Sequence, residues 1–393
     1  MKNNYNTTIR ACFTGYIVQA IVNNFIPLLF LTLQKSYSIA LSQITLLITI
    51  NFTVQLLVDL LSVLFIDRIG YRASMVIAHL FAAAGLVSLT ILPEIFPSPF
   101  SGILTAVVIY AIGGGILEVL VSPIVEACPS DNKEKAMSML HSFYCWGHVG
   151  VVLFSTLFFT LAGIQNWKLL AIIWAVIPVA NALVFCKVPI APLIEDGEKG
   201  MTMGELFKSK VFWLFFIMMF CAGASEQAVS QWASTFAEKG LEISKTAGDL
   251  AGPMAFAFLM GTSRALYGRF GHRINLEKFM AASACLCIIS YLGISLLNTA
   301  FFNLIACGIC GLSVGIMWPG TFSKASATIS KGGTAMFAML ALAGDVGCSA
   351  GPTIVGFISG CFNDDLKKGI LVGTAFPLVL LVGILKSRKS KML

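Results

Sequence analysis

The sequence predicts an all-α membrane protein of twelve transmembrane helices, arranged as two six-helix halves. Its 393 residues are 57% hydrophobic and only 11% charged, whereas a soluble domain is about 25% charged. Apolar stretches long enough to cross a bilayer recur along the whole chain. An arginine-rich motif after the second stretch returns in a similar form after the eighth.

Twelve apolar runs define the expected helices. They cover residues 8–34, 43–66, 73–93, 100–127, 136–164, 167–186, 211–238, 247–268, 276–297, 300–323, 334–361 and 367–386. An even number of spans places both chain ends on one side of the membrane. Most of the 26 lysines and arginines lie in the two ends and in the loops after even-numbered runs. We therefore expect a multi-pass protein of the cell inner (plasma) membrane with both termini in the cytoplasm.

One polar segment divides the chain into two parts. Residues 187–210 have Glu195-Asp196-Gly197-Glu198-Lys199-Gly200 at their centre, which is typical of a cytoplasmic linker. It would join an N-terminal half, 1–186, to a C-terminal half, 211–393. The halves repeat: Gly147 of the fifth run has a counterpart in Gly347 of the eleventh. Paired halves suggest a carrier that rocks around a site near the bilayer midplane.

Several other classes of function find no support. No G-x-x-x-x-G-K stretch occurs, so we expect no ATP bound by a P-loop. The net charge of +7 is explained by the lysines and arginines of the cytoplasmic loops, which orient the membrane helices, and it does not indicate a nucleic-acid partner. The eleven cysteines show no paired metal-ligand spacing. We therefore expect no cofactor, no metal and no enzymatic activity.

Glu118 is the most informative residue of the chain. It follows Gly113-Gly114-Gly115 and precedes Pro123 within an apolar run. An ionised carboxylate in hydrocarbon costs at least ~2.5–3.5 kcal/mol, so it must face a polar cavity, find a partner or carry a proton. Desolvation favours the neutral acid, and Glu118 is thus a candidate for coupling to protons. A glutamate hydrogen-bonded only for packing is the alternative.

Other polar residues share helix faces inside the membrane. Carboxamides both donate and accept hydrogen bonds, and tryptophan offers an apolar face to sugar C–H groups. A surface of this kind would bind a solute rich in hydroxyl groups, although each residue could instead tie helices together. The histidines could carry protons or act as neutral hydrogen-bond linkers. The candidate substrate-binding residues are Asn23, Asn24, Glu118, His141, Tyr144, Glu226, Gln227, Gln231, Trp232 and Trp318.

The loop after the second run resembles a motif of the major facilitator superfamily. Asp67, Arg68, Gly70 and Arg72 match its D-R-x-G-x-R pattern, although Val63 stands where the motif begins with glycine. The resemblance implies that this loop latches the two halves on the cytoplasmic side. In the superfamily the second and eleventh helices pack between the halves. The residues implied in conformational switching are Asp59, Asp67, Arg68, Arg72 and Asp345.

Within that superfamily the chain is similar to the fucose–proton symporter family. Its fourth-helix pattern G-x-x-x-E-x-x-x-N-P is matched by Gly114, Glu118 and Pro123, with Ser122 in place of the asparagine. His141, Tyr144 and Gly147 stand at the polar, polar and glycine places of the family's fifth helix, and Glu226 and Trp232 resemble the acid and tryptophan of its seventh.

The resemblance implies a proton-coupled carrier of a monosaccharide or related polyol that works as a monomer. The family's fucose carrier has an acid in its first helix, where this chain has Asn23 and Asn24. This departure leaves Glu118 and Glu226 as the main candidates for the coupling proton, and it favours a solute other than fucose. An exporter of drugs or metabolites is the alternative transporter. A membrane sensor that does not transport is the alternative from another class.

Overall fold

The chain folds into two compact units, residues Met1–Glu195 and Asp196–Leu393. The computed structural model describes residues 5–129, 133–191, 201, 203–270, 274–329 and 333–389. Every regular element within these ranges is a helix, and no strand occurs in them. The boundary between the units falls inside residues 187–210. Residues 192–200 and 202 of that segment lie outside the described residues, and its role as a linker stays a prediction.

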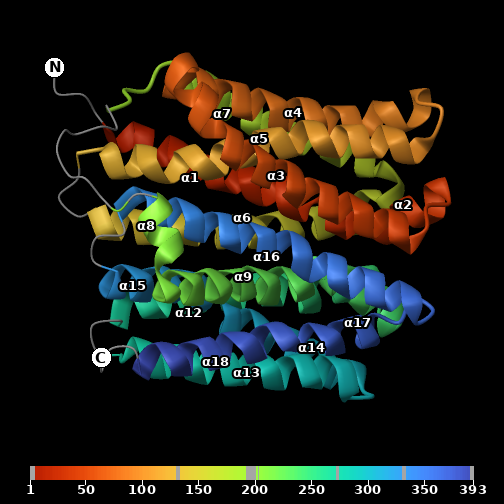
Figure 1. Ribbon diagram of the computed structural model, residues 1–393. Helices are drawn as coiled ribbons and strands as arrows, with labels where there is room; N and C mark the ends of the chain where they lie inside the picture. Colours follow the sequence, from red (N-terminus) through yellow and green to blue (C-terminus); the bar gives the residue numbers. More distant parts are fainter. Residues whose placement is uncertain are drawn as a thin grey trace. The chain divides into compact units, whose positions relative to one another are not determined.

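Unit 1 contains the first six predicted spans. Its helices are α1 (Tyr5–Asn24), the 3₁₀ helix η1 (Ile26–Leu29), α2 (Phe30–Tyr37), α3 (Leu41–Ile69), α4 (Tyr71–Ile95), α5 (Pro99–Ala127), α6 (Lys133–Ala162), the 3₁₀ helix η2 (Ile164–Asn166) and α7 (Trp167–Phe185). Helix α5 packs along α4, α3 and α1, and α1 also packs along α6 (Figure 1). Helix α5, which carries Glu118, is therefore surrounded by other helices of its unit.

Unit 2 contains the remaining spans. Its helices are α8 (Met203–Lys208), α9 (Lys210–Ser230), α10 (Ala233–Thr235), the π-helix η3 (Phe236–Gly240), α11 (Lys245–Asp249), the π-helix η4 (Leu250–Met254), α12 (Ala255–Phe270), α13 (Leu276–Leu296), α14 (Ala300–Val314), α15 (Met317–Thr328), α16 (Gly333–Cys361), α17 (Leu366–Gly373) and α18 (Ala375–Lys389). Helices α9 and α16 lie side by side along much of their length (Figure 1).

Eleven helical segments of the described chain are long and apolar enough to cross a membrane. They correspond to eleven of the twelve predicted runs, and the prediction of a multi-helix membrane protein is confirmed. The run missing from this set is 247–268, which folds as part of α11, η4 and α12. Asp249, Pro253 and Arg264 make this run less apolar than the others.

The first span of each unit is interrupted, although the sequence predicts one continuous run for each. In unit 1 the α-helix ends at Asn24, and Pro27 lies in the 3₁₀ turn that follows. Proline lacks an amide hydrogen and clashes with the preceding turn, which accounts for this break. In unit 2 the helix is interrupted at Gln231 and Trp232, where the Trp232 amide bonds to the carbonyl of Val229. Interrupted helices at corresponding places in two halves are typical of transporter binding sites.

The repeated glycines allow the same close helix contact in both units. A Cβ atom at Gly147 of α6 would lie 2.9 Å from the Cβ of Ala20 and 3.0 Å from the Cα of Ile17 on α1. A Cβ atom at Gly347 of α16 would overlap the carbonyl oxygen of Phe220 on α9. The fifth span of each half therefore packs closely on the first.

Replacing Gly347 with alanine should destabilise unit 2. The added methyl group meets backbone atoms of α9, which cannot rotate away, and overpacking of this kind typically costs about 1–3 kcal/mol. Gly360→Ala on the same helix is the matched control, because no atom lies within 4 Å of a Cβ there. Thermal unfolding of the purified protein should show a lower midpoint for Gly347→Ala alone. Equal midpoints for the two variants would contradict the packing described here.

Candidate substrate and coupling sites

Two hydrogen bonds join α1 to α5 around Glu118. The Gln19 amide nitrogen donates to Oε2 of Glu118 at 2.8 Å. One turn away, the hydroxyl groups of Tyr16 and Ser122 are 2.8 Å apart. The contact of α1 with α5 therefore contains a polar seam, made of Tyr16, Gln19, Glu118 and Ser122. Glu118 lies in this seam rather than against hydrocarbon.

Asn23 is the centre of a second network in unit 1. Its side-chain oxygen accepts hydrogen bonds from the amide nitrogens of Gln55 at 2.8 Å and Asn51 at 3.3 Å, both on α3. The next residue, Asn24, donates to the Tyr144 hydroxyl of α6 at 3.4 Å. The structure thus brings the predicted residues Asn23, Asn24 and Tyr144 to the contacts of α1 with α3 and α6.

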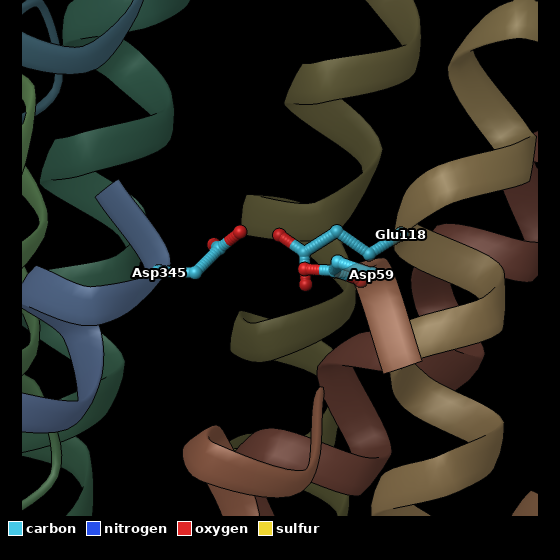
Figure 2. A group of neighbouring side chains, drawn as sticks. All are labelled: Asp59, Glu118 and Asp345. Atoms are coloured by element: carbon cyan, nitrogen blue, oxygen red, sulfur yellow. The ribbon is translucent and has the colours of Figure 1, made fainter. Parts of the chain in front are cut away.

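Asp59 lies beside Glu118. Carboxylate oxygens of the two side chains are within 4.8 Å of one another, and Figure 2 shows them next to each other, Asp59 from α3 and Glu118 from α5. Two full negative charges 4.8 Å apart would repel by about 3.5 kcal/mol at an effective dielectric constant near 20, and by more at a shorter separation. Asp345, which the figure also labels, belongs to α16 of unit 2.

The histidines of α6 differ in exposure. His141 is exposed, and its ring centroid lies 5.5 Å from that of Tyr16. His148, two turns further along, is buried. The predicted residue His141 therefore lies near the Tyr16–Ser122 pair of the polar seam.

Glu226 of α9 is half of an ion pair in unit 2. Its Oε2 accepts from the guanidinium of Arg264 at 3.1 Å, and both side chains are largely buried. The Nε of Arg264 also donates to the carbonyl of Gly315 at 3.2 Å, where α14 gives way to α15.

The carboxamides of α9 continue from this ion pair. Gln227 donates to Glu226 at 3.4 Å, and Gln231 donates to Gln227 at 3.0 Å. Three polar side chains of this span are thus joined by hydrogen bonds, and their contact with a solute stays a prediction. These hydrogen bonds end at the interruption of the first span of unit 2.

The two predicted tryptophans have different surroundings. Trp232 is fully buried, and its indole nitrogen donates to the carbonyl of Pro352 at 3.0 Å. It ties the interruption between α9 and α10 to α16, so stacking on a solute would require a change of conformation. Trp318 is partly exposed and packs on Gly344, where any side chain would overlap its ring. Their contact with a solute stays a prediction.

The switching residues are described only in part. The side chains of Asp67 and Arg68 lie outside the described residues. Arg72, at the start of α4, donates from Nη1 to the carbonyl of Phe185 at the end of α7, at 2.8 Å. The contact joins two helix ends of unit 1, and the latch between the halves stays a prediction.

Replacing Arg72 with alanine should slow transport several-fold and leave the affinity for solute nearly unchanged. The residue lies at the end of a helix that contributes no residue to the polar seam, so we expect no effect on solute binding. Arg72→Lys, which keeps the positive charge, is the control. Initial transport rates and equilibrium binding, measured on both variants, separate rate from affinity. We expect Arg72→Lys to retain more of the rate. Loss of equilibrium binding in folded Arg72→Ala protein would assign the residue to the solute site instead.

The predicted list left out several members of these sites, among them Gln19, Arg264 and Gln55. An arginine inside a membrane span is itself a signal of function, but its partner depends on how α9 and α12 pack. Gln55 was visible as part of a polar stripe on the second run. Its hydrogen bonds to α1 required the structure.

The fold of this chain resembles the folds of solved transporters over nearly the whole chain. The crystal structure of the Escherichia coli fucose:proton symporter is 16% identical, with a TM-score of 0.67 over 98% of this chain and 99% of that chain. A D-xylose–proton symporter is 12% identical, with a TM-score of 0.79 over 97% and 96%. A nucleoside transporter is 13% identical, with a TM-score of 0.72 over 97% and 99%. At these identities the likeness shows a shared fold.

A match to a protein-family sequence model shows which family this chain belongs to. The model described as Major Facilitator Superfamily matches residues 11–352. A search of curated proteins found no match. Together with the helical fold, the match confirms the expectation drawn from the D-R-x-G-x-R loop, and the chain belongs to the major facilitator superfamily.

Proposed function

We propose that this protein is a secondary active transporter of a small polar solute, a monosaccharide or related polyol, coupled to protons and working by alternating access. The observation that supports it most is the polar seam of unit 1. There Glu118 bonds to Gln19 at 2.8 Å within a membrane-spanning helix. A chain accepts a carboxylate at this depth when the group binds substrate or carries an ion.

The proposed solute class follows from the carboxamides. Gln19, Asn23 and Asn24 in unit 1 and Gln227 and Gln231 in unit 2 all take part in hydrogen bonds. Each amide donates and accepts, as each hydroxyl group of a sugar does. Structures that share the fold include carriers of fucose, xylose and nucleosides. Those solutes agree with a hydroxyl-rich substrate.

The proposed coupling group is Glu118. Glu226 already has the guanidinium of Arg264 at 3.1 Å, so its charge is compensated within unit 2. Glu118 is bonded to the neutral amide of Gln19 and lies beside a second acid, Asp59, and two acids this close repel each other when both are ionised. We therefore assign proton uptake to Glu118 first and to Glu226 second. The protein would act as a monomer in the plasma membrane with both termini in the cytoplasm.

An uptake screen tests the proposal. Proteoliposomes containing the purified protein would be given radiolabelled hexoses, pentoses, polyols and nucleosides, with and without an inward proton gradient. We expect at least one sugar or polyol to accumulate, and to do so only with the gradient. Empty liposomes are the control. Transport of lipophilic drugs in place of every sugar and polyol would favour the exporter function.

A further inference from the structure

Gln55 of α3 holds a buried oxygen atom that its surroundings leave without a hydrogen bond. The residue is 2% exposed, and its amide nitrogen donates to Asn23 at 2.8 Å and to the side-chain oxygen of Asn51 at 3.1 Å. In this arrangement the nitrogen end of the Gln55 amide faces Asn23 and Asn51. The other end, Oε1, is buried with no hydrogen-bond partner. Buried acceptors are nearly always satisfied, so this atom indicates a missing donor or cation.

This oxygen lies at the contact of α3 and α5. It is 3.5 Å from the place that a Cβ atom of Gly114 would occupy. Gly114 is one helical turn before Glu118 on α5, and Asp59 is one turn after Gln55 on α3. The unsatisfied oxygen therefore lies at the same contact of α3 with α5 as the two carboxylates, which Figure 2 shows next to each other.

The three side chains offer only oxygen ligands. Carboxylate oxygens of Asp59 and Glu118 lie within 4.8 Å of one another, a separation that one metal ion can bridge. Oxygen ligands select hard cations over zinc or copper. Glu118 Oε2 already accepts from Gln19, so few oxygens remain. Calcium takes six to eight oxygens, more than these three side chains offer, so we assign a monovalent ion.

We propose that Gln55, Asp59 and Glu118 form a sodium-binding site in unit 1. Sodium would satisfy the Gln55 oxygen and neutralise the repulsion between the two acids. Because Gln19 links Glu118 to α1, the ion would also order the polar seam. The inference rests on the proposed function only in using the same seam, where sodium would bind beside the proton-coupling group Glu118. The ion site itself does not depend on which solute is carried.

Binding of radioactive sodium to the full-length protein in detergent tests this site. Equilibrium binding would be measured without solute or gradient, at fixed pH, with choline replacing sodium at constant ionic strength. We expect saturable binding with one site per chain. Asp59→Asn should weaken sodium binding about tenfold or more, the lower end of the loss seen when residues supporting a metal site are changed. Gln55→Leu should weaken it as well.

Matched variants keep the test decisive. Glu94→Gln removes an acid of unit 1 that pairs with Lys168 instead, and it should bind sodium as the wild type does. Asp59→Glu keeps the charge but moves the carboxylate oxygens, so it replaces Asp59→Asn as the test variant if Asp59→Asn does not fold. Folding of each variant is checked by gel filtration and thermal unfolding.

Three results would overturn the sodium site. One is the absence of saturable sodium binding by folded wild-type protein, and another is undiminished binding by folded Asp59→Asn. Displacement of sodium by micromolar calcium or magnesium would make the site one for divalent ions. Failure of the proposed function is distinguishable, because sugar uptake can fail while sodium binding persists, and sodium binding can fail while proton-driven uptake persists.

Discussion

Replacing Arg264 with methionine should destabilise the folded protein and abolish transport. The guanidinium lies 3.1 Å from Glu226, and the two side chains are 14% and 10% exposed. Removing one partner of such a pair leaves an uncompensated buried charge, which costs ~3–5 kcal/mol. The loss should appear as a large fall in the thermal unfolding midpoint and in the yield of monodisperse protein.

The double variant Arg264→Met/Glu226→Gln is the control for this prediction. It removes both charges, so its unfolding midpoint should lie above that of Arg264→Met alone. Arg264→Lys keeps the positive charge but loses the second bond, from Nε to the carbonyl of Gly315, and should be intermediate. If the two single substitutions lower the midpoint by amounts that add up in the double variant, the side chains do not interact energetically.

Replacing Glu118 with glutamine should leave solute exchange intact and eliminate uphill uptake driven by a proton gradient. Glutamine has the shape of the protonated carboxyl and still donates a hydrogen bond to a hydroxyl group. It cannot release a proton. Counterflow and gradient-driven accumulation, measured in the same proteoliposomes, separate binding and exchange from coupling.

Glu226→Gln is the parallel variant for the coupling prediction. If Glu118 carries the proton, Glu226→Gln should fail through the stranded Arg264 charge, with lower stability as well as lower transport. Full gradient-driven accumulation by Glu118→Gln would contradict the assignment and move the coupling role to Glu226 or to a histidine.

The fold of this chain could be predicted from sequence because hydrophobicity is a local property. Each span needs about twenty apolar residues in succession, and eleven of the twelve expected runs are spans by this measure. The run 247–268 differs because Asp249, Pro253 and Arg264 interrupt it. The sequence repeat corresponds to a structural one, since Gly147 and Gly347 make equivalent close helix contacts in the two units.

The site could be predicted only residue by residue. Helical periodicity showed that Glu118 and Asp59 each belong to a polar face, but it could not show that the faces of α3 and α5 meet. The pairing of Glu226 with Arg264 likewise depends on the rotation of α9 and α12. Trp232 was assigned to the solute from its chemistry, whereas its buried indole bonds to Pro352.

Proton movement caused by the solute tests the central claim most directly. A solute found in the uptake screen would be added outside lightly buffered proteoliposomes that have no imposed gradient, and the external pH followed. A proton-coupled carrier should take up protons with the solute, so the medium should become more alkaline for the wild type and stay unchanged for Glu118→Gln. Solute entry into wild-type proteoliposomes without any change in external pH would contradict the account.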